Sequence, residues 1–446
     1  MSLTHTKLFT ALTLAFAITA CGGGSSAPGN EPIQSLTIET SVGKINGPVA
    51  NITYNISNSV SHTVAVRFLY RIDIDNDGVD ELLIAGFESG PSHNNSYLQT
   101  NINIFGWNQG VFQNITAKLL PNDSNIVDGV GDVVLGDFNG DGKLDIFLSA
   151  YVDVEVEAGV YVLWNKGNHF VKEKIDTVLG YQHGAAAADI NNDGFTDILA
   201  VGYGKASKIY LGSATGMINN PIPEWSANGS GVAIADFLNN GTQTAFIVDR
   251  GFNPDLALVK FVFDQSRVVN LNTIYSGPTS LLQEKGHDVR AKALDFNKDG
   301  LIDVIVSTKE WYNGTVWPTN SRLQFLKNNG DGTFQDVTNQ TLLKYDTNSH
   351  APYNLVFLDI NGDGHIDIFT SDSQWEGSNN STSMIINNGN NTFTETVRHE
   401  FSKIAASWGG SSTILRGPNK GLFIAVDNPT YKSSHSLSLY EFQLKK

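Results

Sequence analysis

The stretch Asp137–Ala150 reads DFNGDGKLDIFLSA. Side-chain oxygens alternate at Asp137, Asn139 and Asp141, a glycine follows, and Asp145 opens an apolar run. If the loop is numbered from its first aspartate, positions 1, 3 and 5 can point at one cation and glycine at position 6 permits the reversal. Position 7 can offer its carbonyl, and position 9 returns a carboxylate. The stretch therefore predicts a loop for a hard cation such as Ca²⁺ that leads directly into a β-strand.

The same pattern recurs along the chain. Seven copies of the pattern begin 47 to 64 residues apart, and this spacing is typical of the blades of a β-propeller. Five copies are intact, and two, here called worn, lack ligand residues at some loop positions. In chain order the seven copies, here called loops 1 to 7, begin at Asp73, Asp137, Asp189, Asp236 (worn), Asp295, Asp359 and Arg416 (worn).

Each unit can be read as four β-strands. A strand of small residues, such as GAAAADI at 184–190, precedes the loop, and small side chains suit the innermost strand of a blade because blades converge on an axis. A second strand leaves the loop, and a hairpin with an Asn/Gly turn follows, as in LWNKGNHF at 163–170. We therefore expect an all-β, seven-bladed β-propeller over residues 61–446. Residues 33–60 carry strand patterns outside the seven units, which predicts a strand that closes the ring or a cap.

The predicted calcium ligands follow the loop positions. Loop 4 has Leu238 and Thr244 at positions 3 and 9, and loop 7 places Arg416 and Lys420 where the ion would be, so both should be free of metal. The alternative is a set of metal-free turns, in which the clustered carboxylates would repel one another. We expect about five calcium ions in a structural role, held by Asp73, Asp75, Asp77, Val79 and Glu81; Asp137, Asn139, Asp141, Lys143 and Asp145; Asp189, Asn191, Asp193, Phe195 and Asp197; Asp295, Asn297, Asp299, Leu301 and Asp303; and Asp359, Asn361, Asp363, His365 and Asp367.

The spacing D-x-[DN]-x-D-G-x-x-[DE] resembles the FG-GAP or VCBS repeat of bacterial surface proteins and of integrin α-chain propellers. The resemblance covers roughly residues 61–446 and rests on the five intact copies. It implies a calcium-stabilised propeller that binds its ligand on the face away from the calcium loops.

The N-terminus is typical of an exported protein. Lys7 precedes an apolar run over residues 8–20 that is too short to span a bilayer, which predicts a signal peptide over residues 1–20. The sequence Ile18-Thr19-Ala20-Cys21 resembles the bacterial lipobox. This resemblance implies lipidation of Cys21, and the absence of aspartate at Gly22 implies the outer membrane. Residues 21–32 are expected to form a flexible tether. The alternative for Cys21, the only cysteine, is a buried structural role.

The charge of the chain narrows the choice of partners. The formal net charge is −16, and removal of residues 1–20, which contain one lysine and no acid, gives −17. Such an excess argues against nucleic acid, whose phosphates attract Lys and Arg. Membrane contact is expected through the N-terminal lipid alone, on a protein of the bacterial cell envelope.

Aromatic residues recur six to eight positions after the ninth loop position, on the predicted far face. Rings interspersed with polar groups suit stacking on sugars or anchoring of a protein partner, so we expect a glycan or surface-protein ligand in adhesion or recognition. The alternative is that these rings only pack blade against blade. The predicted ligand-binding residues are Tyr151, Tyr203, Trp311, Tyr312, Trp317 and Trp375.

A second set of residues on the predicted far face has catalytic chemistry. His, Tyr and Arg together resemble the base, acid and carboxylate-neutralising group of a polysaccharide lyase that acts on uronate polymers. The alternative is that single histidines in repeat loops are turn or capping residues, and an envelope scaffold without ligand affinity is a third possibility. The candidate catalytic residues are His183, His287, Arg290, His350 and Tyr353.

Overall fold

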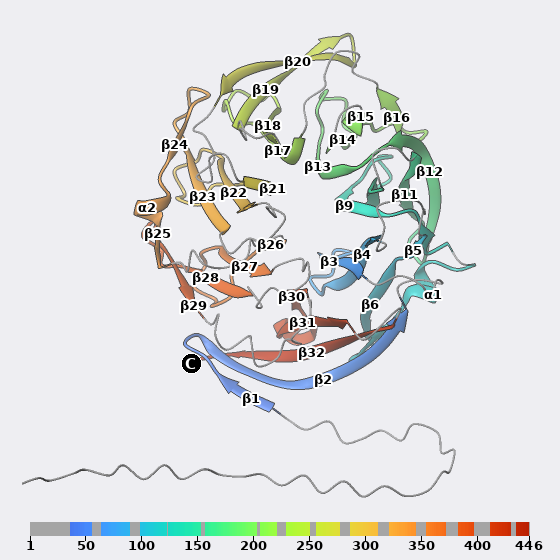
Figure 1. The fold of residues 1–446 in the computed structure, drawn as a ribbon, viewed down its shortest axis with the longest axis vertical. Coiled ribbons are helices and arrows are strands. Elements are labelled where there is room, and N and C mark those ends of the chain that lie inside the picture. The colour runs from blue at the N-terminus through green and yellow to red at the C-terminus, as the bar shows by residue number, and fades with distance from the viewer. Residues whose placement is uncertain are drawn as a thin grey trace, which may run out of the picture. The chain divides into compact units, whose positions relative to one another are not determined.

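A ring of seven β-sheets surrounds a central cavity in the computed structural model of the protein (Figure 1). The structure describes residues 36–55, 64–89, 99–122, 124–152, 157–202, 206–220, 229–249, 256–276, 286–310, 321–344, 354–371, 382–396, 411–429 and 434–445. The all-β, seven-bladed propeller predicted from the repeats is confirmed.

The blades follow chain order, with the strands given from the innermost outward. Blade 1 contains β3 (Val64–Ile72), β4 (Glu81–Ser89), β6 (Asn103–Asn108) and β7 (Val111–Asn114). Blade 2 contains β9 (Val130–Gly136), β10 (Asp145–Ala150), β11 (Glu157–Asn165) and β12 (Phe170–Leu179). Blade 3 contains β13 (Gln182–Ala188), β14 (Asp197–Gly202), β15 (Lys208–Leu211) and β16 (Ile218–Asn220). Blade 4 contains β17 (Gly229–Ala235), β18 (Thr244–Asp249), β19 (Leu256–Asp264) and β20 (Arg267–Ser276).

Blade 5 contains β21 (Gly286–Leu294), β22 (Asp303–Glu310), β23 (Ser321–Asn328) and β24 (Phe334–Asp336). Blade 6 contains β26 (Asn354–Leu358), β27 (Asp367–Ser371), β28 (Ser383–Asn387) and β29 (Phe393–Thr396), with β25 (Leu342–Lys344) at its outer edge. Blade 7 contains β30 (Ser412–Arg416), β31 (Leu422–Pro429), β32 (Ser434–Leu444), β2 (Gly43–Asn55) and β1 (Leu36–Glu39). Short elements complete the described chain: β5 (Thr100–Asn101), β8 (Ile126–Val127), α1 (Thr116–Leu119), α2 (Thr338–Thr341) and a 3₁₀ helix at Pro418–Lys420.

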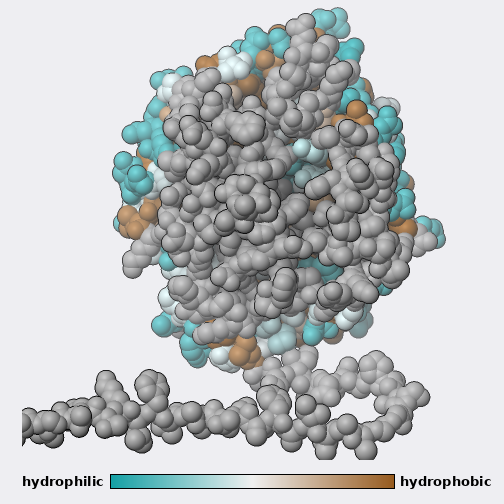
Figure 2. Space-filling view, in the orientation of Figure 1, coloured by the Kyte–Doolittle hydropathy of each residue, from teal (hydrophilic) through white to brown (hydrophobic). Residues whose placement is uncertain are grey.

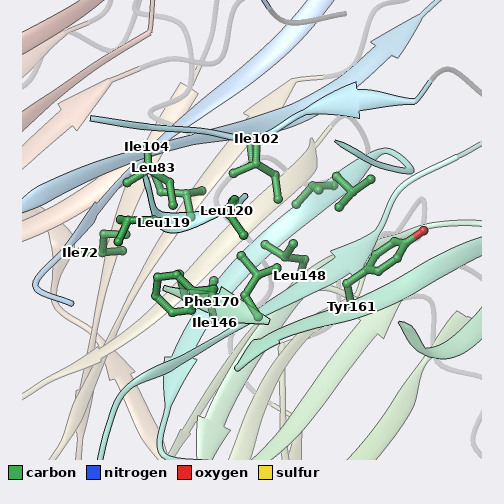
Figure 3. Close-up of a cluster of buried hydrophobic side chains, with 14 residues drawn as sticks. Ile72, Leu83, Ile102, Ile104, Leu119, Leu120, Ile146, Leu148, Tyr161 and Phe170 are labelled. Atoms are coloured by element: carbon green, nitrogen blue, oxygen red, sulfur yellow. The ribbon is translucent and has the colours of Figure 1, made fainter. Parts of the chain in front are cut away.

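Apolar side chains gather between the blades. Seven large clusters of buried residues each join two neighbouring blades, so every sheet has a buried apolar stripe on both of its faces. Figure 3 shows the cluster between blades 1 and 2, where Leu83 and Ile104 face Ile146, Leu148 and Phe170. Burial on both faces explains why strands such as DIFLSA are continuously apolar instead of alternating.

Blade 7 combines the two ends of the described chain. Strand β2 pairs antiparallel with β32 from Gly43 opposite Leu444 to Asn55 opposite Ser434, with one irregularity between Asn46 and Ala50. Strand β1 then adds to the outer side of β2. Residues of the 33–60 segment thus supply two strands of the last blade.

A buried polar network crosses this closing sheet. The Tyr54 hydroxyl on β2 donates to an Asp427 carboxylate oxygen on β31 at 2.7 Å, and His435 on β32 lies 2.9 Å from the same carboxylate group. All three side chains are buried. Because β32 separates the other two strands, the network joins three strands across one face of the sheet.

The rim of the ring, over the outer strands, is mainly hydrophilic in the view of Figure 2. Single apolar side chains such as Val171 and Ile274 are exposed on outer strands. Within the residues that the structure describes, no helix is both long and apolar enough to cross a membrane.

Loss of the Tyr54 hydroxyl should weaken ring closure. We expect Tyr54→Phe to lower the free energy of unfolding by about 1–2 kcal/mol, because a buried hydrogen bond to a charged acceptor is removed. Thr37→Ala is the control, since it deletes an exposed hydrogen bond to Asn46 in the same sheet and should change stability by less than about 0.5 kcal/mol. Urea unfolding would measure both, and equal effects would contradict the assigned role.

Candidate metal loops and central channel

The intact loops share one backbone arrangement. In loop 2 the Asp137 carboxylate accepts from the backbone N–H groups of Asp141 at 3.0 Å and Gly142 at 2.8 Å. Gly142 has φ of +80°, a conformation that favours glycine. The position-1 aspartate accepts from positions 5 and 6 in the other four intact loops as well. These bonds curl each loop around its first carboxylate.

The aspartate at position 9 ties loops 2, 3, 5 and 6 to their blades. In loop 2 one Asp145 oxygen accepts from the N–H of Phe138 in the loop at 3.3 Å, and the other accepts from the N–H of Asn165 on the third strand at 2.8 Å. Asp197, Asp303 and Asp367 make the equivalent pairs of bonds. One side chain therefore fixes the loop, the second strand and the third strand together.

Burial of these carboxylates affects their ionisation. The four aspartates at position 9 are fully buried. Burial raises the pKa of Asp197 and Asp303 to about 7 and that of Asp145 and Asp367 to about 6. Burial likewise raises the pKa of Glu81, the counterpart in loop 1, to about 7. Near neutral pH these groups therefore hold negative charge at an energetic cost unless a cation lies beside them.

The donor chemistry of the loops fits a hard cation. Carboxylate oxygens of Asp73, Asp75 and Asp77 lie within 4.8 Å of one another, the one purely acidic cluster of this kind among the described residues. The other intact loops carry Asn at position 3, so an amide oxygen takes the place of one carboxylate. Two carboxylates at position 5 also contact a lysine, Asp141 with Lys143 at 3.2 Å and Asp299 with Lys327 at 2.8 Å.

Loop 4 keeps the turn but lacks two of the oxygen donors. Its Asp236 carboxylate still accepts from the N–H groups of Asn240 at 3.0 Å and Gly241 at 2.7 Å. At position 9 the Thr244 hydroxyl donates to the Ala235 carbonyl at 3.1 Å. The turn therefore forms with a neutral side chain at position 9 and leucine at position 3.

Arg416, the first residue of loop 7, extends to blade 1. Its guanidinium lies 2.7 Å from Asp80 and 2.9 Å from Asp73, the first residue of loop 1. Arg71 lies 2.9 Å from the fully buried Asp80 as well. In place of a metal loop, this junction between the last and first blades contains an ion-pair network.

The loops of successive blades lie side by side. The N–H of Thr196 in loop 3 donates to the Asp137 carbonyl of loop 2 at 3.2 Å. Lys298 of loop 5 donates to the Gly364 carbonyl of loop 6 at 3.0 Å. Together with the contact of Arg416 to loop 1, these bonds place the loops on one face of the ring.

Among the predicted ligand-binding aromatic residues, Tyr151 lies in the part of the chain that the structure describes. Its ring stacks on Phe87 of blade 1 with centroids 3.9 Å apart and contacts Tyr181, beside β13 of blade 3, at 5.2 Å. This geometry matches the alternative in which such rings pack between blades. Tyr203, Trp311, Tyr312, Trp317 and Trp375 lie outside the described residues, as does Cys21.

Two of the candidate catalytic residues come together. Arg290 donates to the backbone carbonyl of His183 and forms an ion pair with Asp132 at 2.9 Å, and all three side chains are buried. The His183 ring contacts Tyr151 and Tyr181 edge to face. The side chain of His287 lies outside the described part, as do His350 and Tyr353.

The innermost strands of all seven blades line a central cavity of about 710 Å³. Its walls contain charged residues that the sequence patterns did not single out: Arg71, Asp80, Asp132 and Lys292. The available signal was a charge inside a strand of small residues, as in GDVVLGDF at 131–138 and RAKALDF at 290–296.

One comparison with known proteins identifies the repeat. A family model described as the FG-GAP-like repeat matches residues 73–148 and 295–370. No curated protein matches the chain. Among solved structures, the Dos1 propeller is 12% identical, with 87% of this chain and 94% of that one covered and a TM-score of 0.43. An α-L-arabinanase of Penicillium chrysogenum, complexed with arabinobiose, is 11% identical, with 92% of this chain and 98% of that one covered and a TM-score of 0.43.

The repeat matches and the seven sheets together identify the chain as a seven-bladed β-propeller that carries FG-GAP-like repeats.

Proposed function

We propose that the protein is a calcium-stabilised recognition propeller, anchored by a lipid on Cys21 in the bacterial cell envelope, that binds a glycan or a protein through the face away from its metal loops. The supporting observation is the set of five carboxylates at position 9, four of them buried and Glu81 half-buried. Each lies beside a cluster of oxygen donors, and desolvation raises the pKa of each. A cation in each intact loop would offset this charge.

Removal of calcium should destabilise the propeller, and more so at pH 7.5 than at pH 5.5. In the calcium-free folded state these carboxyl groups have pKa values of about 6 or 7 and keep their protons up to that pH. In the unfolded chain their pKa values are the lower, ordinary ones, so the protons are lost at lower pH. The folded state then binds more protons between these limits, so stability without calcium falls as the pH rises through them. Thermal unfolding with and without calcium at both pH values tests this, and an equal loss at both would contradict it.

A matched pair of variants tests where the ions bind. Asp193→Ala removes the position-5 carboxylate of the intact loop 3, and Asn240→Ala changes the same position of the worn loop 4. Calorimetric titration should give one bound calcium fewer for Asp193→Ala and an unchanged number for Asn240→Ala. At a free calcium concentration of about 100 times Kd, each lost site should cost about 2.7 kcal/mol of stabilisation.

Lipid anchoring makes a separate prediction. Cys21 ends the apolar run of the N-terminus and precedes GGGSSAPGNEP, which has the composition of a tether. Cys21→Ser should move the protein from the membrane fraction to the soluble fraction, because no lipid can be attached. Cell fractionation measures this, with Ser25→Ala in the tether as the control. Retention of the Cys21→Ser protein in membranes would argue against the anchor.

Ligand recognition is assigned to the loops that carry Trp311 and Trp375. Large rings beside polar groups provide stacking surfaces for sugars and anchors for protein partners. Trp311→Ala combined with Trp375→Ala should abolish binding to cells or to a glycan array by a protein that still folds, whereas Trp164→Phe, on β11 of blade 2, should leave binding intact. Unchanged binding by the double variant would contradict this assignment and favour a scaffold.

The lyase alternative receives less support. It needs Arg290 to neutralise a uronate, and that guanidinium is already occupied by Asp132 and by two backbone carbonyls. Incubation with uronate polymers tests this alternative. Ultraviolet absorbance from an unsaturated product would support the lyase function.

A further inference from the structure

Lys292 occupies an unusual place in the innermost strands. The position three residues before each loop lies on the innermost strand of its blade. From blade 1 to blade 7 the residues at this position are Tyr70, Val134, Ala186, Ala233, Lys292, Val356 and Thr413. Lys292 is the single charged member. Lys292 is exposed although it lines the central cavity, so it borders the open space within the ring.

The other charged side chains that line the cavity are paired. Arg71 and Arg416 share Asp80, and Arg416 also contacts Asp73. Arg290 pairs with Asp132. Among the described residues, Lys292 has neither a hydrogen bond nor an ion pair. The described channel wall therefore holds four cations and three carboxylates and carries one net positive charge, in a chain whose formal charge is −16.

Asp132 is the carboxylate of the channel wall that acts on Lys292, but its oxygens are already in use. They accept from Arg290 at 2.9 Å, from the N–H groups of Val133 and Ala185 at 3.0 Å each, and from the Tyr70 hydroxyl at 3.3 Å. The pKa of Lys292 is lowered, mainly by desolvation within the ring; Asp132 opposes this shift and Arg290 adds to it. An anion beside the ammonium group would favour its charged form.

We propose that the central cavity binds a ligand carrying a single carboxylate, which Lys292 holds by a charge-assisted hydrogen bond. The volume of about 710 Å³ lies in the range of small-molecule pockets and would accommodate one sugar acid or a smaller carboxylate. Small and apolar residues such as Ala186, Val232 and Ala293 form much of the wall, so polar contacts converge on a few groups. This site depends neither on calcium nor on the aromatic loops of the proposed function.

Calorimetric titration of the full-length protein with sodium galacturonate, sodium acetate and neutral galactose tests the proposal at constant calcium. Galacturonate should bind, and Lys292→Met should weaken its binding roughly tenfold or more, because a hydrogen bond to a charged group is lost. Lys292→Arg should retain binding. Lys260→Met, which removes an exposed lysine on β19 of blade 4 and changes the net charge equally, should behave as wild type. Acetate that binds as tightly as galacturonate would show that a free carboxylate suffices, and tighter galacturonate would show that the sugar ring contributes.

A measurement on the wild-type protein removes any dependence on folding of the variants. Reductive methylation followed by mass spectrometry should show that galacturonate slows modification of Lys292 and leaves Lys260 unaffected. Wild-type protein that binds neither carboxylate, Lys292→Met that binds as tightly as wild type, or the absence of protection at Lys292 would each overturn the proposal. None of these results would bear on surface recognition through Trp311 and Trp375.

Discussion

A buried aspartate at the start of the second strand connects four of the five intact loops to their blades. Both oxygens of Asp145 accept backbone N–H groups, one from the loop and one from the third strand. The Asp145 carboxylate is needed for this geometry. Its negative charge, however, is unfavourable in the buried space between strands. A cation held by the oxygens at positions 1, 3 and 5, as proposed, would offset that charge. The geometry of the blade and the proposed cation site would then depend on the same group, which would explain why the motif recurs as a whole.

The junction between blades 7 and 1 meets the same requirement differently. Asp80 is fully buried there, and its partners are the guanidinium groups of Arg71 and Arg416. Protein cations there neutralise the buried carboxylate, the role proposed for bound calcium in the intact loops. Since breaking a buried ion pair leaves an uncompensated charge, these guanidinium groups help to fix the seam. The last blade also receives its outer strands from the beginning of the described chain, so the seam is held at its inner and outer sides.

The sequence predicted the features that are local. Repeat spacing identified seven blades, and loop positions such as Asp137 and Asp145 could be assigned because their partners lie within a few residues. Contacts between distant segments could not be read in this way: Arg416 meets Asp80 across 336 positions of the chain, and Arg290 meets Asp132 across 158. Tyr151 shows a different limit. Its distance from the ninth loop position identified it as part of the repeat. That its ring stacks on Phe87 is seen only in the structure.

The pairing of β2 with β32 has a consequence for how the chain reaches its final form. Tyr54 and Asp427 are separated by 373 positions. Strand β2 leaves the ribosome early and finds its hydrogen-bonding partner only after the seventh blade has been made. Until then its N–H and C=O groups form an open strand edge, a template for pairing with other chains. A contact between segments so far apart also carries a large loop-closure entropy and forms slowly. Strands β1 and β2, which open the described part of the chain, are thus among the last to be placed, and for that interval the nascent propeller is exposed to aggregation.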